Sequence, residues 1–149
     1  MRSDRRYDVA IAGGGFAGRT LGLALARLAP DGFRIALIDA EPARAEPARV
    51  EGSGAEDARA LALSAATKNL LSALDLWQEL APSAQAIEAI EITDSPLNAH
   101  LRPHFLGFDA ELKSDGANAH MVEHGVLVRV LEGAVAKAPA IEIFAPDSI

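Results

Sequence analysis

The sequence predicts an α/β fold whose first part is one β-α-β unit, and three observations support this prediction. An apolar run with strand character occupies Val9–Ala12. The glycine-rich stretch Gly13–Gly18 follows directly and leads into a segment that carries leucines at helical spacing through Leu28. A second apolar run, Ile35–Ile38, ends at Asp39. A right-handed crossover through the helix predicts that the two strands are parallel and adjacent.

The glycine stretch has the spacing G-x-G-x-x-G at Gly13, Gly15 and Gly18. In such a loop the first glycine allows a tight turn, the second lets the backbone approach a pyrophosphate, and the third lets the helix lie close to the strand. A helix that begins here presents free N–H groups and the positive end of its dipole to phosphate. We therefore expect a strand–turn–helix whose N–H groups point into a phosphate-sized hollow.

Asp39 follows Gly18 by about 20 residues, the distance at which the dinucleotide fingerprint places an acid that hydrogen-bonds the adenosine ribose. The alternative is a glycine-rich turn in an α/β protein that binds no ligand. Because strand, turn, helix, second strand and acid all agree, the pattern favours dinucleotide binding.

Composition narrows the class of protein. The chain has 149 residues, enough for one domain with a core, and its net charge of −7 argues against nucleic acid as a partner. It has no cysteine, which excludes disulfides, thiolate catalysis and cysteine-type zinc sites. A short polar start leaves no room for a signal peptide, and no apolar run reaches the ~20 residues that span a bilayer. We expect a cytoplasmic protein.

The middle of the chain predicts a loop followed by one long helix. Prolines and glycines in residues 41–55, where Glu-Pro-Ala-Arg occurs twice, predict the least ordered internal segment. Ser64 is the expected N-cap of a helix whose apolar face runs on through Trp77 and Leu80 until Pro82 stops it. Trp77 is expected in the core, with ligand stacking as the alternative.

The second half predicts an antiparallel pair, then a helix and a last strand. Residues 87–93 alternate like a half-buried strand, and residues 100–108 are expected to pair with them. His100 and His104 have the spacing of a helical metal site, but Pro103 opposes a helix and no acid completes a ligand set, so surface histidines and no metal are expected. A loop at 111–118, a short strand or turn at 121–123, a helix at 126–136 and a strand at 141–144 complete the expected order.

Two stretches carry a family resemblance. Asp8–Gly18 resembles the first FAD-binding motif of flavoprotein monooxygenases of the para-hydroxybenzoate hydroxylase type. The segment Asp57–Ser64, with the helix ending at Leu76-Trp77, is similar to the ubiquinone-biosynthesis hydroxylases, the 2-polyprenyl-6-methoxyphenol hydroxylase family; Met121–Leu127 also fits this pattern. The resemblance implies a Rossmann-like FAD/NAD(P)-binding βαβ domain with part of an antiparallel substrate-domain sheet. Residues 1–149 would be the N-terminal part of the FAD-binding domain, with 87–120 as a partial substrate-domain insertion.

The resemblance also implies roles for individual residues. The cofactor-binding set would be Gly13, Gly15, Phe16, Ala17, Gly18, Asp39, Arg59 and Glu123, with His124 as an alternative to Glu123 near the ribityl chain. Arg59 would reach the cofactor, since a guanidinium suits phosphate or a flavin edge; the alternative is a surface arginine beside Glu56 and Asp57. No catalytic residue is identified, because the chemistry belongs to the cofactor.

The chain departs from the family at two points. Arg19 stands where the family usually has an apolar or small residue, and it is expected either in solvent or near the phosphates. Family members are also much longer and carry later Asp-Gly and Gly-Asp motifs together with most of a substrate domain. These differences predict the N-terminal part of such an enzyme, which alone would not hydroxylate at a useful rate.

Three functions follow. The first is the FAD-binding part of a monooxygenase that hydroxylates a polyprenylated phenol in ubiquinone biosynthesis, with NAD(P)H as reductant and an aromatic or quinone-precursor substrate. The second is an NAD-binding Rossmann protein, and the third is a fold remnant that no longer binds cofactor. For the first, an association with the inner membrane surface or a biosynthetic complex stays open, and uncovered sheet edges predict self-association.

Overall fold

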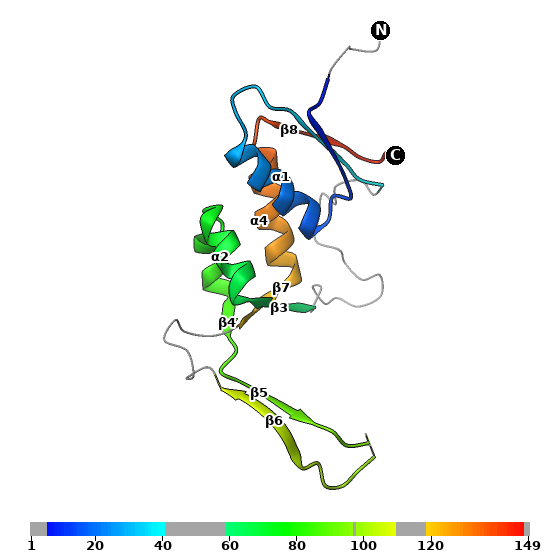
Figure 1. The fold of residues 1–149 in the computed structure, drawn as a ribbon, viewed down its shortest axis with the longest axis vertical. Coiled ribbons are helices and arrows are strands. Elements are labelled where there is room, and N and C mark those ends of the chain that lie inside the picture. The colour runs from blue at the N-terminus through cyan, green and yellow to red at the C-terminus, as the bar shows by residue number, and fades with distance from the viewer. Residues whose placement is uncertain (1–5, 41–58, 97, 110–118, 148–149) are drawn as a thin grey trace.

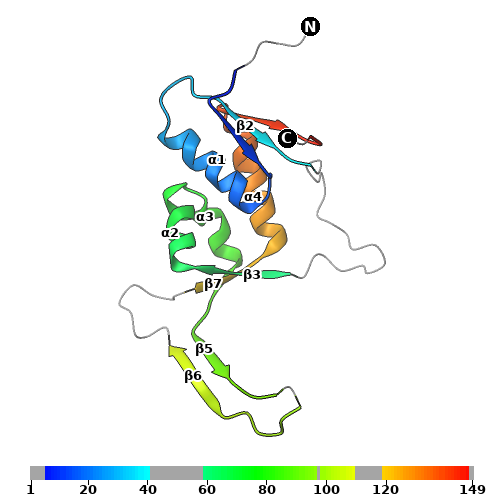
Figure 2. The same cartoon turned by 45° about the vertical axis from the view of Figure 1, so that its right-hand side comes forward.

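The computed structural model describes residues 6–40, 59–96, 98–109 and 119–147. Its elements form a parallel sheet at one end, a helical middle with a small antiparallel sheet, and a two-stranded hairpin that projects at the other end (Figures 1 and 2). The expected loops at 41–55 and 111–118 lie outside the described residues. Among the described residues, no helix is long and apolar enough to cross a membrane.

The parallel sheet contains β1 (Val9–Ala12), β2 (Ile35–Ile38) and β8 (Ile141–Phe144) in the order β1-β2-β8. β2 pairs parallel with both neighbours, so the predicted parallel arrangement of the first two strands is confirmed. The helix α1 (Phe16–Leu28) connects β1 to β2, with Gly15 as its N-cap, and ends at the predicted Leu28. The last strand is also confirmed.

The second sheet contains β3 (Ala60–Ser64), β7 (Ala119–Glu123) and β4 (Ala84–Ala86), all antiparallel, in the order β3-β7-β4. Of these, only β7 overlaps an expected strand. β3 and β4 each contain two alanines and no β-branched residue, a composition that favours strands only weakly, and their strand state depends on β7 pairing with both of them. The helix α4 (His124–Ala136) follows β7 without a loop and begins two residues before its predicted start.

The predicted single helix from Ser64 to Pro82 is wrong. It is divided into α2 (Ala65–Ala73) and α3 (Trp77–Leu80), and Pro82 lies in a 3-10 turn at Ala81–Ser83. The break is a Schellman motif: the Leu76 N–H donates to the Leu71 carbonyl and the Asp75 N–H to the Ser72 carbonyl. Asp75 has φ 61. Glycine usually occupies such a position, and with aspartate there the sequence carries no strong stop signal.

The hairpin consists of β5 (Ala89–Thr93) and β6 (His104–Asp109), which pair antiparallel with an irregularity between Ile92 and Thr93. The predicted antiparallel pair is confirmed, although both strands begin later than expected. The expected half-burial of the first strand is wrong, since all of β5 is exposed. The hairpin projects away from the other described elements, so neither face is covered by them (Figure 1).

The core has two parts, and α4 contributes to both. The larger cluster lies between α2, α3, α4 and the antiparallel sheet; the smaller one lies between the parallel sheet and its helices. All four residues of the predicted apolar face of α4 are buried, namely Leu127, Val130, Leu131 and Val135. Trp77 packs against the larger cluster, as expected, although it is only partly buried.

Candidate functional site

The glycine loop has the predicted strand–turn–helix form. β1 ends at Ala12, Gly13 adopts φ +97, and α1 begins at Phe16. Gly13 therefore occupies a left-handed conformation that residues with a Cβ rarely adopt. Its N–H donates to the Ile38 carbonyl at 2.7 Å, which joins the turn to the end of β2.

The other two motif glycines have different surroundings. A Cβ placed on Gly18 would lie 1.9 Å from the Gly13 carbonyl oxygen, so α1 and the turn approach each other closely here. A Cβ placed on Gly15 would meet nothing within 4 Å. Gly15 is the N-cap of α1, no side chain caps the helix, and its first turn contains no acid. An uncapped helix N-terminus beside open space fits a phosphate group.

Asp39 lies directly after β2, beside the glycine loop. Its N–H donates to the Phe144 carbonyl at 2.9 Å, and its carbonyl accepts from the Asp147 N–H at 2.8 Å. A Cβ placed on Gly14 would lie 2.3 Å from Asp39 Oδ2. The carboxylate thus lies against the Gly14 backbone. Sequence reasoning did not single out Gly14; the signal was that glycine also occupies the position between the motif residues Gly13 and Gly15.

A cavity of about 200 Å³ adjoins Asp39. Arg19 and Glu132 contribute an ion pair to its wall, with 3.0 Å between Arg19 Nη2 and Glu132 Oε1 and with side chains 14% and 28% exposed. Arg19 belongs to α1 and Glu132 to α4. The expectation that Arg19 lies in solvent is wrong, because its side chain is mostly covered. The remaining lining residues are Gly14, Leu37, Val135, Ala136, Ile143 and Ala145.

The other candidate residues gather around the N-termini of α1 and α4. The Phe16 and His124 rings meet edge to face with centroids 5.2 Å apart. The His124 N–H donates to the Arg59 carbonyl at 2.9 Å, which continues the pairing of Ala60 with Glu123. The side chains of Arg59 and Glu123 are exposed, as is Ala17 in the first turn of α1. The fold thus places Arg59 opposite His124 and Ala60 opposite Glu123, and the contact of His124 with Phe16 links this end of the sheet to the glycine loop.

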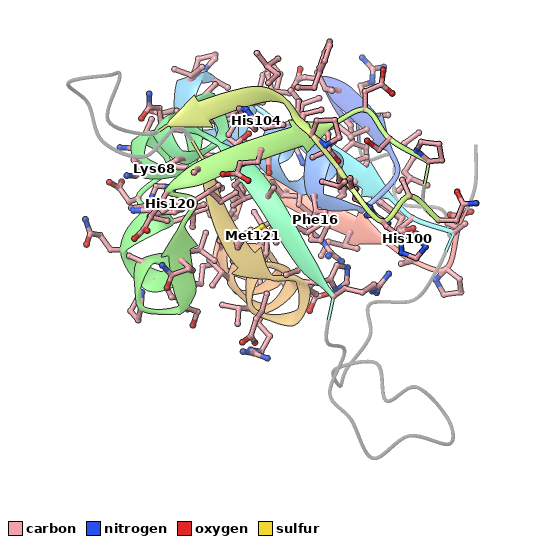
Figure 3. All side chains as sticks on the ribbon, turned by 90° about the horizontal axis from the view of Figure 1, so that it is seen from below. Phe16, Lys68, His100, His104, His120 and Met121 are labelled. Atoms are coloured by element: carbon pink, nitrogen blue, oxygen red, sulfur yellow. The ribbon has the colours of Figure 1, made fainter. Side chains whose placement is uncertain are left out.

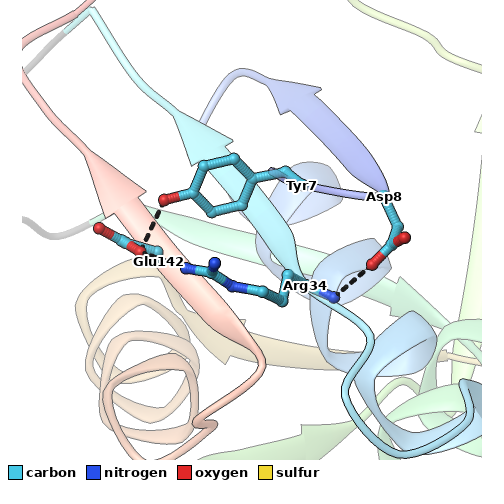
Figure 4. Close-up of polar contacts among 4 residues, drawn as sticks. All are labelled: Tyr7, Asp8, Arg34 and Glu142. Atoms are coloured by element: carbon cyan, nitrogen blue, oxygen red, sulfur yellow. Dashed lines mark hydrogen bonds and ion pairs between the residues drawn. The ribbon is translucent and has the colours of Figure 1, made fainter. Parts of the chain in front are cut away.

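A polar cluster braces the parallel sheet at the ends of three chain segments (Figure 4). The Tyr7 hydroxyl donates to Glu142 Oε2 at 2.7 Å, and Arg34 Nη2 pairs with the same oxygen at 3.3 Å. The Arg34 guanidinium lies 4.8 Å from the Tyr7 ring centroid, and its backbone N–H donates to Asp8 Oδ2 at 2.8 Å. Because these contacts join residues just before β1 and β2 to Glu142 within β8, they stabilise the strand order that places Asp39.

His120 on β7 is a titratable residue that the sequence did not single out. Burial, and then the nearby Lys68 charge, lower the pKa of His120 below its ordinary value. Its ring lies edge-on to Trp77 at 5.1 Å, and the Lys68 ammonium lies 5.3 Å from the Trp77 ring centroid. The Trp77 ring thus contacts side chains of the protein itself, which supports the expectation that it belongs to the core. Figure 3 shows His120 and Lys68 close together.

His100 and His104, the pair with helical metal-ligand spacing, are well separated (Figure 3). His104 begins β6, and His100 lies before that strand in residues without regular structure. Among the described residues, no group of three histidine, aspartate or glutamate side chains is placed to hold a metal ion.

Comparison with known proteins places these features in context. No protein-family model matches the chain. It is 31% identical over 147 residues to the uncharacterized protein slr1300 of Synechocystis, a match that covers 99% of this chain and 32% of the relative. It is 32% identical over 146 residues to the ubiquinone hydroxylase UbiL of Rhodospirillum rubrum, covering 97% and 30%. With the 3-demethoxyubiquinol 3-hydroxylase of Escherichia coli, identity is 31% over 142 residues, covering 95% and 33%. The chain therefore spans about a third of the length of these relatives.

Solved structures share the fold. PqsL of Pseudomonas aeruginosa, described as a probable FAD-dependent monooxygenase, matches with a TM-score of 0.64 and 18% identity over 94% of this chain and 33% of its own. The flavin-dependent monooxygenase PieE, solved with FAD and substrate, matches with a TM-score of 0.61 and 20% identity over 95% and 24%. These matches confirm the predicted fold class. The resemblance predicted from the sequence is confirmed by the two hydroxylase relatives, of which this chain covers about a third.

Proposed function

We propose that this chain is the FAD-binding part of a flavin-dependent monooxygenase that hydroxylates a polyprenylated phenol in ubiquinone biosynthesis. One observation carries the cofactor assignment: Gly18 lies against Gly13, Gly15 borders open space, and Asp39 lies beside the same loop. This combination suits an adenine dinucleotide, with pyrophosphate at the helix N-terminus and ribose at the acid. The names of two relatives, a ubiquinone hydroxylase and a 3-demethoxyubiquinol 3-hydroxylase, support the substrate class.

The proposed roles divide the candidate residues into two groups. Backbone N–H groups of the glycine loop, including those of Phe16 and Ala17, would bind the pyrophosphate, while the Asp39 carboxylate would accept hydrogen bonds from the ribose. Arg59 and Glu123, beside the N-terminus of α4, would approach the ribityl half. When bound, FAD would supply the redox chemistry with NAD(P)H as reductant. The residues of this chain would bind and orient the cofactor.

We further propose that residues 1–149 form part of the FAD-binding domain and that residues 87–120 belong to a substrate-domain insertion. The projecting hairpin β5–β6 supports this division. Exposed apolar side chains near it include Leu101, 86% exposed, and Phe105, 70% exposed. Such a surface favours self-association or contact with a biosynthetic complex or membrane surface.

Two other functions use the same fold. An NAD-binding protein is the first, because Asp39 would suit the ribose of NAD equally well. A remnant that has lost cofactor binding is the second. The solved structures that share the fold include a probable FAD-dependent monooxygenase and one with FAD bound, which favours FAD over both.

Calorimetric titration of the purified chain with FAD, NADH and ADP tests the proposal. We expect FAD to bind with quenching of flavin fluorescence and ADP to compete with it. Tighter binding of NADH would favour the NAD alternative, and no binding of any nucleotide would favour the remnant. Gly15→Ala is the variant that tests the pyrophosphate position. Its methyl group meets no protein atom within 4 Å but would enter the proposed pyrophosphate space, so FAD affinity should fall.

A separate assay with NADPH and a prenylated phenol tests catalysis. We expect binding without hydroxylated product, because the chain matches only about a third of the hydroxylases. Product formation coupled to NADPH consumption would show that these 149 residues supply a complete site.

A further inference from the structure

The cavity beside Asp39 contains an ion pair, Arg19 with Glu132, that the dinucleotide fingerprint does not include. We propose that Arg19 is the hydrogen-bond-donating arm of the ribose site, that Glu132 positions it, and that the site selects an adenosine ribose without a 2′-phosphate. This inference rests on the proposed function and deepens it. The juxtaposition on which it depends is that Arg19, Glu132 and Asp39 line one cavity of about 200 Å³.

Arg19 lies in the first turn of α1, close to where the pyrophosphate would bind, and its side chain is only 14% exposed. The ion pair with Glu132 at 3.0 Å restrains the guanidinium at the cavity wall. A guanidinium has five N–H donors, and the contact with Glu132 engages the Nη2 nitrogen. Within the part of the chain that the structure describes, the ion pair with Glu132 leaves the donors on the other nitrogens for a ligand.

A sugar hydroxyl has the hydrogen-bonding groups to lie between Asp39 and Arg19. An ionised carboxylate only accepts hydrogen bonds and a guanidinium only donates them, whereas a sugar hydroxyl does both. A ribose hydroxyl beside Asp39 can therefore donate to the carboxylate and accept from Arg19. Neither Asp39 nor Arg19 alone would complete the hydrogen bonding of that hydroxyl.

The charged side chains of the cavity disfavour a 2′-phosphate. The cavity contains two acidic side chains, Asp39 and Glu132, and one basic side chain, Arg19. A 2′-phosphate would bring further negative charge next to two carboxylates, which is unfavourable in a partly buried site. A neutral hydroxyl adds no charge, so the cavity should favour adenosine over its 2′-phosphorylated form.

The competing explanation is that Arg19 and Glu132 only brace α1 against α4. A brace affects stability and would change the affinity for all nucleotides equally. A ribose-binding role changes the ratio between ligands that differ at the 2′ position. That ratio is therefore the decisive measurement.

The experiment measures calorimetric affinities of the purified chain for two pairs of ligands that differ only at the 2′ position: ADP with 2′-deoxy-ADP, and AMP with adenosine 2′,5′-bisphosphate. The variants are Arg19→Leu, Arg19→Gln, Glu132→Leu and the double variant Arg19→Leu/Glu132→Leu, each checked for folding by thermal melting. Arg27→Leu is the matched control, because Arg27 lies on the same helix, pairs with Asp75, and does not line the cavity.

We expect the wild type to prefer ADP over 2′-deoxy-ADP and AMP over adenosine 2′,5′-bisphosphate. Arg19→Leu should reduce the preference for ADP over 2′-deoxy-ADP by roughly tenfold, the effect of one charge-assisted hydrogen bond. Glu132→Leu should reduce the same preference, the double variant should lose no more than Arg19→Leu, and Arg27→Leu should leave it unchanged. Arg19→Gln, which keeps a donor, should retain part of it.

An unchanged ligand ratio in folded Arg19→Leu or Arg19→Gln would overturn the inference while leaving the proposed function intact. A wild type that prefers the 2′-phosphorylated ligand would also overturn it. A wild type that binds neither ADP nor FAD would overturn the proposed function, and the inference with it.

Discussion

Replacing Gly18 by alanine should deform the glycine loop, because the new methyl carbon would lie 1.9 Å from the Gly13 carbonyl oxygen and 3.4 Å from the Ile11 side chain. The obstacle is backbone, so no rotamer change relieves the contact. To reach an ordinary nonbonded distance, α1 must move away from the turn by at least about 1 Å. Overpacking of this kind costs ~1–3 kcal/mol, and we expect the upper part of that range.

Gly15→Ala is the matched comparison. The added methyl group meets nothing within 4 Å, and Gly15 has φ −72, which alanine adopts freely. The loss in unfolding free energy should stay under about 1 kcal/mol, the difference between glycine and alanine at an N-cap. FAD affinity should nevertheless fall by at least roughly tenfold, or ~1.4 kcal/mol, because the methyl group would occupy the proposed pyrophosphate space.

Urea unfolding followed by circular dichroism, together with flavin fluorescence titration, separates the two effects. Gly18→Ala should lose both stability and FAD binding, whereas Gly15→Ala should lose binding and keep nearly all of its stability. A wild-type unfolding midpoint for Gly18→Ala would refute the close contact between α1 and the turn. Wild-type FAD affinity for Gly15→Ala would refute the proposed position of the pyrophosphate.

Three further predictions concern stability. Ser64→Ala should lower the unfolding free energy by about 1 kcal/mol in urea titrations, because Ser64 Oγ accepts from the Thr67 N–H at 3.2 Å as the N-cap of α2; Ser72→Ala, inside the same helix, should have little effect and is the control. Burial lowers the pKa of His120, so folding disfavours a proton that the unfolded chain binds. Its stabilising contribution is complete above the unfolded pKa of about 6.5 and is lost as the pH falls through the folded pKa. His120→Gln should therefore flatten the fall in urea midpoint between about pH 7 and pH 5, and the same fall in His120→Gln as in wild type would contradict this; the exposed His100→Gln is the control. Asp75→Ala should be less stable than Asp75→Gly by about 1–2 kcal/mol in thermal or urea unfolding, because residue 75 has φ 61 and both changes remove the same exposed ion pair.

Local patterns determined the elements that form from neighbouring residues. Hydrophobic periodicity located β1, β2 and the buried face of α4, and glycine spacing located the turn that leads into α1. Ser64 was predicted as an N-cap from its residue type and position, and the hydrogen bond that its hydroxyl accepts comes from Thr67, three residues later. In each case the stabilising contact is short in sequence, so the residue types alone carry the information.

Elements that depend on distant partners were missed. β3 and β4, which contain no β-branched residue, become strands by pairing with β7, from a part of the chain well separated in sequence. The helix break at Asp75 uses a left-handed residue that is not glycine, so no sequence signal marked it. The exposure of β5 depends on which elements lie beside the hairpin, and alternation alone does not report this.

The candidate site divides in the same way. The motif glycines and Asp39 were predicted from the sequence because a β-α-β unit places them together through one short crossover. The contact between Gly14 and Asp39, the pairing of Arg19 with Glu132, and the joining of Arg59 to His124 depend on the packing of α1, β2, α4 and β3. Only the tertiary structure decided these contacts, because each joins side chains or backbone from elements whose relative position no local pattern encodes.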